Sequence, residues 1–341
     1  MKRSFIITAI SILALASCAR QNTAGLNDDA SLFFESWISH NYPAAARTTL
    51  GAYVLEETAG TGDPVGDSIF VRLNYNSHTL DGNLSASTSA ALARQNGNYS
   101  KTSYYGPVVA YRGEEFENLP AGVEEAISTM KKGGRKKVAI PGWLSQSERY
   151  SNPDDYLKKC SGTDKIYELE IVDAFSDVER WEKDSLARFI AANYPAAAED
   201  EIGGFYYVSL IPGDQSKTFP SDTAVYINYT GRLLNGMVFD TSIADTAAVW
   251  KLSSSSSSYG PKRINWFDED GGKDYTSITM GDSDSSTSLI EGFSYALSKM
   301  HPYEKGICFF WSGLGYSYSG QGSSIPAYSP LCFEIELTDN E

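Results

Sequence analysis

The sequence has few of the residues that usually bind metals or form disulfide frameworks. Its 341 residues include three histidines and four cysteines, and no two cysteines have a CxxC spacing. Structural zinc sites and disulfide scaffolds are usually built from several closely spaced ligands or paired cysteines. We therefore expect neither a metal site nor a disulfide framework.

Positive charge is also scarce. The chain has 28 Lys and Arg against 43 Asp and Glu, which gives a net charge of -15. Nucleic acids and anionic lipid surfaces attract clustered basic residues. The basic segment KKGGRKK at 131–137 fits a solvated hairpin better than a binding patch in so acidic a chain. Nucleic acid is therefore not an expected partner.

Long hydrophobic runs are missing except near the N-terminus. Lys2 and Arg3 precede the apolar run FIITAISILALA, and small residues lead to Cys18. This order is typical of a secretory signal peptide, and the apolar run is too short to span a bilayer. The ending LASC resembles a bacterial lipobox, whose cysteine becomes the lipidated first residue. An ordinary signal peptide with an incidental cysteine is the alternative.

We therefore predict a signal peptide at 1–17, a lipidated Cys18, and a flexible tether through residue 30. The protein would be exported and anchored to a bacterial membrane through Cys18, the outer membrane more readily than the inner. It would face the periplasm or the cell surface.

A repeated hexapeptide, NYPAAA, occurs at 41–46 and at 193–198. Four further pairs of segments keep the same order: LGAY at 50–53 with IGGF at 202–205, SIFVRLNYNSHTLDG at 68–82 with AVYINYTGRLLNG at 224–236, GVEEAISTM at 122–130 with GFSYALSKM at 292–300, and YELEI at 167–171 with FEIEL at 333–337. This period is far longer than that of solenoid repeats, so the copies are whole domains. We predict domains at 31–176 and 177–341.

Each copy has the pattern of an α+β domain. A helical pattern comes first, and the proline of NYP disfavours helix in the preceding tyrosine, so the helix should end there. Alternating segments then predict strands, and residues 289–300 place their apolar residues on one helical face. We expect an antiparallel sheet wrapped on this short helix and preceded by an N-terminal helix. The serine-rich and acidic stretch at 248–277 is expected to be a loop insertion.

Two cysteines lie in the last two predicted strands. If Phe310 and Phe333 both face inward, strand alternation points Cys308 inward and Cys332 outward. A disulfide between them is therefore disfavoured.

The second copy resembles the FKBP-type peptidyl-prolyl cis-trans isomerases. The resemblance rests on VYINYTGRLLNGMVFDTS, LIEGFSYALSKM, GYSYSGQGSSIP and LCFEIEL, in that order. It implies that four residues are catalytic: Tyr229, Phe239, Asp240 and Tyr316. It implies that five residues bind substrate: Leu289, Ile290, Phe293, Ile325 and Phe333. Phe293 replaces the family's tryptophan, and Gly315 and Ser317 replace the alanine and glycine that flank the family's tyrosine.

The residue types suit rotation about an X–Pro bond. An apolar pocket disfavours the charge-separated planar amide, so it weakens the advantage of that form over the twisted one. By the resemblance, Tyr316 would donate to the substrate carbonyl, while Tyr229 and Asp240 would hold one another. No cofactor is required. The same aromatic cluster, taken alone, is more typical of a structural core than of a site.

The first copy keeps Tyr75 but has Ser85 and Ala86 where the second has Phe239 and Asp240. Leu119, Pro120 and Val123 stand at the positions of Leu289, Ile290 and Phe293. We expect this copy to keep the fold and to be catalytically silent.

The sequence thus predicts an exported lipoprotein with two FKBP-like domains, the second isomerising X–Pro bonds in exported proteins. Its partners would be proline-containing proteins or peptides. The alternative is a non-catalytic FKBP-like chaperone or protein-binding lipoprotein. A third reading is a surface lipoprotein that binds glycans through exposed aromatic residues.

Overall fold

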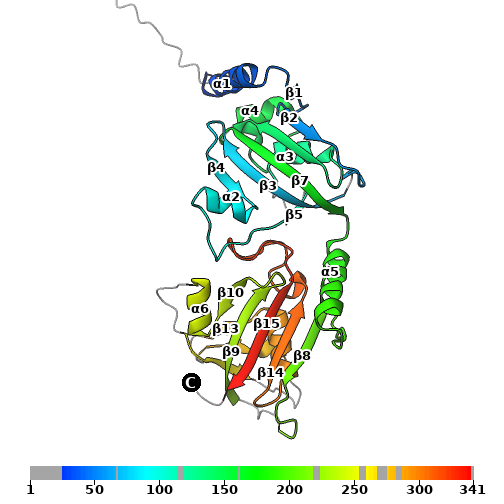
Figure 1. Cartoon of the computed structure of the whole chain (residues 1–341), viewed down its shortest axis with the longest axis vertical. Coiled ribbons are helices and arrows are strands. Elements are labelled where there is room, and N and C mark those ends of the chain that lie inside the picture. Colours follow the sequence, from blue (N-terminus) through cyan, green and yellow to red (C-terminus); the bar gives the residue numbers. More distant parts are fainter. Residues whose placement is uncertain are drawn as a thin grey trace, which may run out of the picture.

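The computed structural model of the chain describes residues 25–66, 68–113, 119–159, 162–217, 223–252, 259–266, 275–281 and 286–338. The predicted signal peptide and Cys18 lie outside the described residues, as does Cys160. Figure 1 shows two sheet-containing domains that follow one another along the long axis of the molecule. Within the described ranges, no helix combines the length and the apolar character needed to cross a membrane.

The first domain is a seven-stranded antiparallel sheet with short helices. Its elements, in chain order, are α1 (Gly25–Asn41), β1 (Ala46–Arg47), β2 (Tyr53–Thr58), β3 (Phe70–Thr79), β4 (Leu84–Ser87), α2 (Ala90–Gln95), β5 (Val108–Tyr111), α3 (Ala121–Ser128), β6 (Arg135–Ile140), the 3-10 helix η1 (Gly142–Leu144), α4 (Pro153–Lys158) and β7 (Lys165–Phe175). The strand order is β1-β2-β6-β7-β3-β4, and β5 also pairs with β3. The buried face of α3, including Val123 and Ile127, lies in the main core of this domain.

The second domain is built on an eight-stranded antiparallel sheet. Its elements are α5 (Val178–Asn193), β8 (Phe205–Ile211), β9 (Thr223–Leu233), β10 (Val238–Thr241), α6 (Ala244–Trp250), β11 (Lys262–Trp266), η2 (Tyr275–Ser277), β12 (Thr279–Met280), β13 (Thr287–Ser288), α7 (Glu291–Lys299), β14 (Lys305–Phe310), η3 (Ser312–Leu314) and β15 (Leu331–Thr338). The strand order is β13-β12-β11-β9-β15-β14-β8, and β10 also pairs with β9.

The two sheets share one topology. The order β2-β6-β7-β3 in the first domain corresponds to β8-β14-β15-β9 in the second. The register agrees as well, because Tyr75 lies opposite Leu169 and Tyr229 lies opposite Ile335. The predicted α+β class, with an antiparallel sheet on a short helix in each of two domains, is confirmed.

Both copies of NYPAAA lie at the end of a helix. Helix α1 ends at Asn41 and α5 ends at Asn193, with Tyr194 as the C-cap residue. The prolines that follow restrict the preceding tyrosines to non-helical conformations, as predicted. Helix α1 begins at Gly25, inside the segment expected to be a tether.

The predicted insertion at 248–277 is not only a loop. Strand β11 lies within it and pairs with the central strand β9. The side chains of Ile264 and Trp266 are almost fully buried, because alternate residues of β11 face the core. The serine-rich and acidic segments on either side concealed this short strand in the sequence.

The two cysteines of the last strands face opposite sides of the sheet. Cys308 belongs to the main core of the second domain, whereas Cys332 packs with α5 on the other face. Both are free thiols, so the expectation from strand alternation is confirmed.

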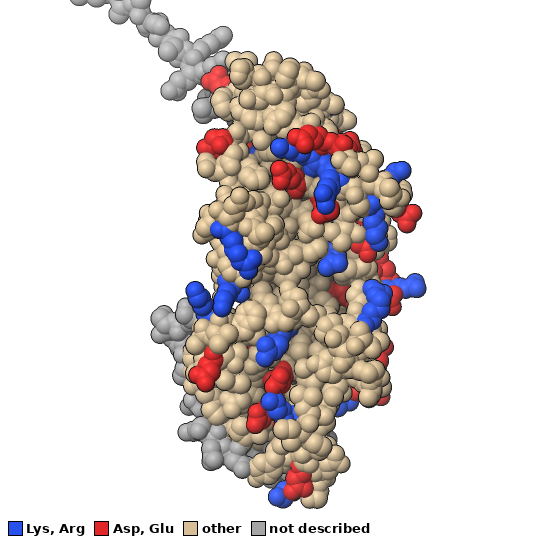
Figure 2. All heavy atoms as spheres, viewed as in Figure 1, with Lys and Arg blue, Asp and Glu red and all other residues tan. Residues whose placement is uncertain are grey.

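Charges of both signs are mixed on one face of the molecule. Figure 2 shows acidic and basic side chains side by side there, rather than one extended patch of a single sign.

A small aromatic cluster joins the two domains. Phe70 and Val109 from the first domain pack against Tyr328 from the second, and the rings of Phe70 and Tyr328 meet edge to face at 5.3 Å. At the start of α5, Trp181 stacks on Phe175 at 4.5 Å. The exit of β7, the first turns of α5 and the loop before β15 are thereby held together.

Glu182 on α5 is a buried carboxyl at this junction. Its Oε2 accepts hydrogen bonds from the backbone nitrogen of Ser312 at 3.2 Å and from Ser312 Oγ at 2.8 Å. Its Oε1 is buried without a hydrogen-bond partner among the described residues. Burial is the main cause that raises the pKa of Glu182 to about 7, and the neighbouring charge of Glu179 adds to it. The carboxyl is therefore protonated in the folded chain below neutral pH.

The raised pKa predicts a stability that depends on pH. Between the ordinary value of 4.5 and about 7, the unfolded chain has lost the Glu182 proton while the folded chain keeps it. The unfolded state then binds fewer protons, so stability falls as pH rises through this window, by roughly 3 kcal/mol for this one group. We expect Glu182→Gln to weaken the dependence of the melting temperature on pH between pH 5 and pH 8, measured by calorimetry. Glu201→Gln, at an exposed position, is the control and should retain the wild-type slope. An unchanged slope in Glu182→Gln would contradict this origin.

Candidate functional site

Three aromatic side chains from three elements meet on the helix side of the second sheet. They are Tyr229 on β9, Phe293 on α7 and Phe333 on β15. The ring centroids lie 5.6 Å apart for Tyr229 and Phe293, and 4.9 Å for Phe293 and Phe333. Phe239 on β10 joins them, with its ring edge-on to Phe333 at 5.5 Å. These tilted geometries are the favourable ones for aromatic pairs.

Two glycines allow this close packing. A Cβ on Gly231 would lie 2.7 Å from the rings of both Phe239 and Phe333, so a side chain here would separate them. Gly292 in the first turn of α7 plays the same part, since its Cβ would lie 2.4 Å from the Phe310 ring. The missing side chains let strand and helix approach closely enough for the aromatic cluster to form.

A hydrogen bond joins the cluster to an exposed carboxyl. The buried hydroxyl of Tyr229 donates to Asp240 Oδ2 at 2.8 Å, and Asp240 itself is exposed. Burial, followed by the charge of Asp240, raises the pKa of Tyr229 far above its ordinary value. Tyr229 is therefore a permanent donor that fixes the carboxylate. The Tyr229 backbone also donates to Ser242 Oγ at 2.9 Å, which holds the end of β10 in place.

The segment 315–330, here named the rim loop, supplies two further residues. Ile325 is buried, and half-buried Tyr316 packs against the same core cluster. Backbone hydrogen bonds of 2.7 and 3.1 Å between Gln321 and Ile325 close the loop on itself. Burial and the charge of Asp240 raise the pKa of Tyr316, so its hydroxyl also stays protonated at neutral pH. No hydrogen bond between described residues engages that hydroxyl.

Leu289 and Ile290 complete the predicted set. Both are half-buried, lie just before α7, and pack against the same cluster. The structure thus gathers all nine residues expected from the sequence around one apolar centre. Four of them provide polar groups or an exposed edge: Tyr229, Phe239, Asp240 and Tyr316.

The sequence gave no sign of a contact from the first domain. Tyr104 belongs to that domain, yet it packs against the main core cluster of the second domain. Its backbone nitrogen donates to the carbonyl of Ser323 in the rim loop at 2.8 Å. A contact across more than 200 residues has no signature in local periodicity or motif spacing.

The first domain retains the position of the site but not its polar groups. Ala86 lies opposite Ser77, as Asp240 lies opposite Gly231, so the predicted loss of the carboxyl is confirmed by register. An apolar cavity of about 270 Å³ remains beside Tyr75, lined partly by Val123 where the second domain has a phenylalanine. The smaller side chain leaves the space open, which the sequence comparison did not anticipate.

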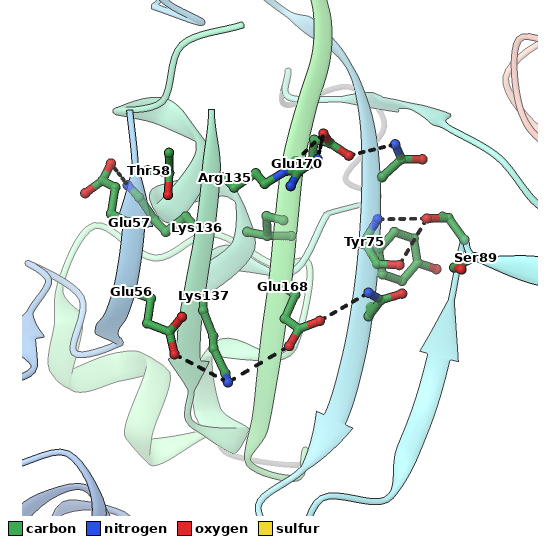
Figure 3. Close-up of a pocket in the computed structure, with 14 residues that line it drawn as sticks. Glu56, Glu57, Thr58, Tyr75, Ser89, Arg135, Lys136, Lys137, Glu168 and Glu170 are labelled. Atoms are coloured by element: carbon green, nitrogen blue, oxygen red, sulfur yellow. Dashed lines mark hydrogen bonds and ion pairs between the residues drawn. The ribbon is translucent and has the colours of Figure 1, made fainter. Parts of the chain in front are cut away.

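A different cavity, of about 610 Å³, lies on the sheet of the first domain (Figure 3). Lys137 lies between Glu56 and Glu168 at 3.7 and 4.0 Å, and Arg135 binds Glu170 at 2.8 Å. Figure 3 shows these groups pointing toward one another across the strands. Their charges are balanced locally, and the arrangement is that of a polar sheet surface.

The described residues do not gather three or more metal-ligating side chains at any point. The site of the second domain instead combines an apolar floor with two tyrosine hydroxyls and one carboxylate. Such a set can bind an apolar ring and direct hydrogen bonds to a nearby carbonyl. It has no nucleophile held by an adjacent base, which covalent catalysis requires.

Comparisons with known proteins identify similar sequences in one family. Residues 265–338 match the family model of FKBP-type peptidyl-prolyl cis-trans isomerases. A probable FKBP-type 25 kDa peptidyl-prolyl cis-trans isomerase of Pseudomonas aeruginosa is 27% identical over 151 residues, which are 44% of this chain and 51% of that protein. The matched region thus spans about half the length of this curated relative.

Three solved structures were also found to be similar. A peptidyl-prolyl cis-trans isomerase from Pseudomonas syringae pv. tomato is 24% identical, with 47% of this chain and 93% of that one covered and a TM-score of 0.30. FkpA from Escherichia coli is 22% identical, with 48% and 59% covered and a TM-score of 0.31. The three FKBP domains of wheat FKBP73 are 15% identical, with 86% and 98% covered and a TM-score of 0.25.

The family match covers β12, β13, α7, β14, η3 and all of β15. It includes six of the nine clustered residues: Leu289, Ile290, Phe293, Tyr316, Ile325 and Phe333. Residues 265–338 of the second domain therefore match the FKBP-type peptidyl-prolyl cis-trans isomerase family, in agreement with the resemblance seen in the sequence.

Proposed function

We propose that the second domain isomerises X–Pro peptide bonds in exported proteins, using the aromatic cluster as its pocket. The observation that carries this proposal is the Tyr229–Asp240 hydrogen bond beside the half-exposed Tyr316, above a floor of Phe293 and Phe333. These groups offer an apolar surface for the proline ring and fixed donors at its edge.

The reaction needs a lower rotational barrier and no covalent intermediate. Rotation about a peptide bond costs about 18–20 kcal/mol, because amide resonance must be lost. An apolar floor destabilises the charge-separated planar amide relative to the twisted one. Tyr316 would donate to the substrate carbonyl, and donors fixed in advance stabilise a transition state without reorganisation. A million-fold acceleration requires about 8 kcal/mol from these effects together.

A non-catalytic binding role is the second candidate. The retained apolar cavity beside Tyr75 favours it, because the first domain offers an apolar recess without a carboxylate at the position of Asp240. A chain with this recess in the first domain and the aromatic cluster in the second could hold unfolded segments at two places. Catalysis by the second domain distinguishes the two candidates.

Substitutions in the second domain should slow peptide isomerisation. We expect Phe239→Ala to lower kcat/KM on a proline tetrapeptide at least about tenfold, since a loss of about 1.4 kcal/mol in transition-state stabilisation is sufficient. Tyr316→Phe should lower kcat more than it raises KM, because the hydroxyl would act on the carbonyl of the twisted amide. The assay is protease-coupled isomerisation with the full chain.

Tyr75→Phe is the matched control, since Tyr75 holds the same register position in the first domain as Tyr229 in the second. It should leave kcat/KM unchanged. Activity of the wild-type chain at the uncatalysed background would refute the isomerase and leave the binding role.

We also propose that Cys18 carries a lipid anchor that holds the protein on a bacterial membrane after export. The support is the sequence order of basic residues, apolar run and LASC. We expect the wild-type chain to incorporate radiolabelled palmitate and to sediment with membranes, because several acyl chains give stable anchoring. Cys18→Ser should lose the label and the membrane association, whereas Cys160→Ser should keep both. Labelling that persists in Cys18→Ser would contradict the anchor.

A further inference from the structure

A segment of the first domain reaches the site of the second. Residues 99–105, here named the strap, follow α2 and lead toward β5. Figure 1 shows this trace descending from α2 to the second domain, beside α6 and the loop that precedes β15. The strap is therefore a candidate part of the site, although it belongs to the domain that lacks the carboxyl.

The strap has an internal structure of its own. The rings of Tyr99 and Tyr105 stack at 5.3 Å, and the Arg94 guanidinium lies over Tyr99 at 3.9 Å. The backbone nitrogen of Ser100 donates to the Tyr105 hydroxyl at 3.1 Å, and the Tyr104 hydroxyl donates to the carbonyl of Pro107 at 3.1 Å. These contacts all lie within the first domain, so they stabilise the shape of the strap without help from the second domain.

On one side, the strap is bound to the rim loop. The backbone nitrogen of Tyr104 donates to the carbonyl of Ser323 at 2.8 Å, and Ser103 Oγ lies 3.3 Å from Ser323 Oγ. Ser323 stands between Tyr316 and Ile325, which both pack on the aromatic cluster. The ring of Tyr104 packs against that cluster as well.

On the other side, the strap is bound to α6. The ammonium group of Lys101 donates to the carbonyl of Val249 at 3.0 Å. Helix α6 begins at Ala244, four residues after Asp240. One attachment thus lies on the rim loop, which carries Tyr316, and the other on α6, which follows the strand that carries Asp240. The strap therefore bridges these two segments.

We propose that the strap closes one side of the rim, and that Lys101 and Tyr104 are specificity-determining residues of the isomerase site. The strap already occupies the backbone carbonyls of Ser323 and Val249 and the apolar surface beside them. A long extended chain crossing the rim here would have to displace it, whereas a short proline peptide would not. The site therefore favours short or terminal proline segments over the interior of long unfolded chains.

This inference rests on the proposed isomerase activity. It gives the first domain a role in selecting the substrates of the second domain by their length. The aromatic contact between Phe70 and Tyr328 holds the two domains together next to the strap. Loss of the carboxyl and the phenylalanine in the first domain is then compatible with a retained contribution to the site. The contribution is steric and specific to substrate length.

The test compares two substrates on the full chain. One is a proline tetrapeptide, and the other is a denatured, disulfide-free protein whose refolding is limited by proline isomerisation. We expect Lys101→Ala/Tyr104→Ala to raise kcat/KM on the protein substrate about fivefold or more, as the loss of about 1 kcal/mol of competing strap contacts implies. The tetrapeptide value should stay within about twofold of wild type.

A matched control removes another Lys–Tyr pair of the first domain. Lys159 Nζ lies over the Tyr150 ring at 4.5 Å, and neither residue contributes to the strap. Lys159→Ala/Tyr150→Ala should leave the ratio of the two kcat/KM values unchanged. Near-UV circular dichroism checks that both double variants keep their packing.

A cross-link tests the opposite direction. In Ser103→Cys/Ser323→Cys, oxidation should pin the strap to the rim loop, lower kcat/KM on the protein substrate at least about threefold, and spare the tetrapeptide. A reducing agent should restore kcat/KM on the protein substrate. In each single variant, oxidation should leave kcat/KM unchanged. The proposal would be overturned if the ratio of the two kcat/KM values were unchanged both in Lys101→Ala/Tyr104→Ala and in the cross-linked protein.

The failure of the isomerase and of the strap are distinguishable. If the wild-type chain shows no isomerisation of either substrate, the proposed function fails. The strap is then tested by fluorescence anisotropy, with the dissociation constants of a labelled tetrapeptide and of a labelled long proline-containing chain. The proposed role of the strap is supported if Lys101→Ala/Tyr104→Ala lowers the dissociation constant of the long chain alone. It is refuted if the dissociation constants of both ligands change equally.

Discussion

The pairing of β9 with β15 in a single register is the constraint on which the site depends. It places Tyr229 opposite Ile335 and Gly231 opposite Phe333, so that alternate side chains of both strands face α7. A slip of one residue would turn every one of these side chains to the other face of the sheet. The glycine at 231 then leaves room for the rings of Phe239 and Phe333, which no other residue would allow without displacement. The aromatic floor is thus a consequence of strand register.

The first domain shows that strand register can be kept while the polar groups of the site are lost. Its strands β3 and β7 repeat the same pairing, with Tyr75 opposite Leu169. The fold persists because the buried faces of strands and helix remain apolar. The site residues carry little of that stability, so Ala86 and Val123 could replace a carboxylate and a large ring. What remains is a cavity without polar groups at its edge.

The junction between the domains connects the first copy to the site of the second. Glu182 on α5 accepts two hydrogen bonds from Ser312, and Ser312 in turn accepts from the backbones of Gly315 and Ser317 on either side of Tyr316. The strap binds the same rim loop from the first domain through Ser323. The loop that carries the tyrosine hydroxyl is therefore supported from the linking helix and from the neighbouring domain. An isolated second domain would lack the second of these supports.

Local patterns determined most of the fold, and the resemblance to the FKBP-type family supplied the nine residues predicted for the second site. Apolar alternation, the proline after each first helix and the repeated motifs act over short distances, so they can be read directly from the sequence. Strand β11 escaped notice because five residues between serine-rich and acidic segments give too short a pattern. The cavity in the first domain, the buried carboxyl of Glu182 and the contact of Tyr104 with Ser323 were decided by tertiary structure alone. Each depends on which distant side chains pack together, and burial and long-range contact have no periodicity in the sequence.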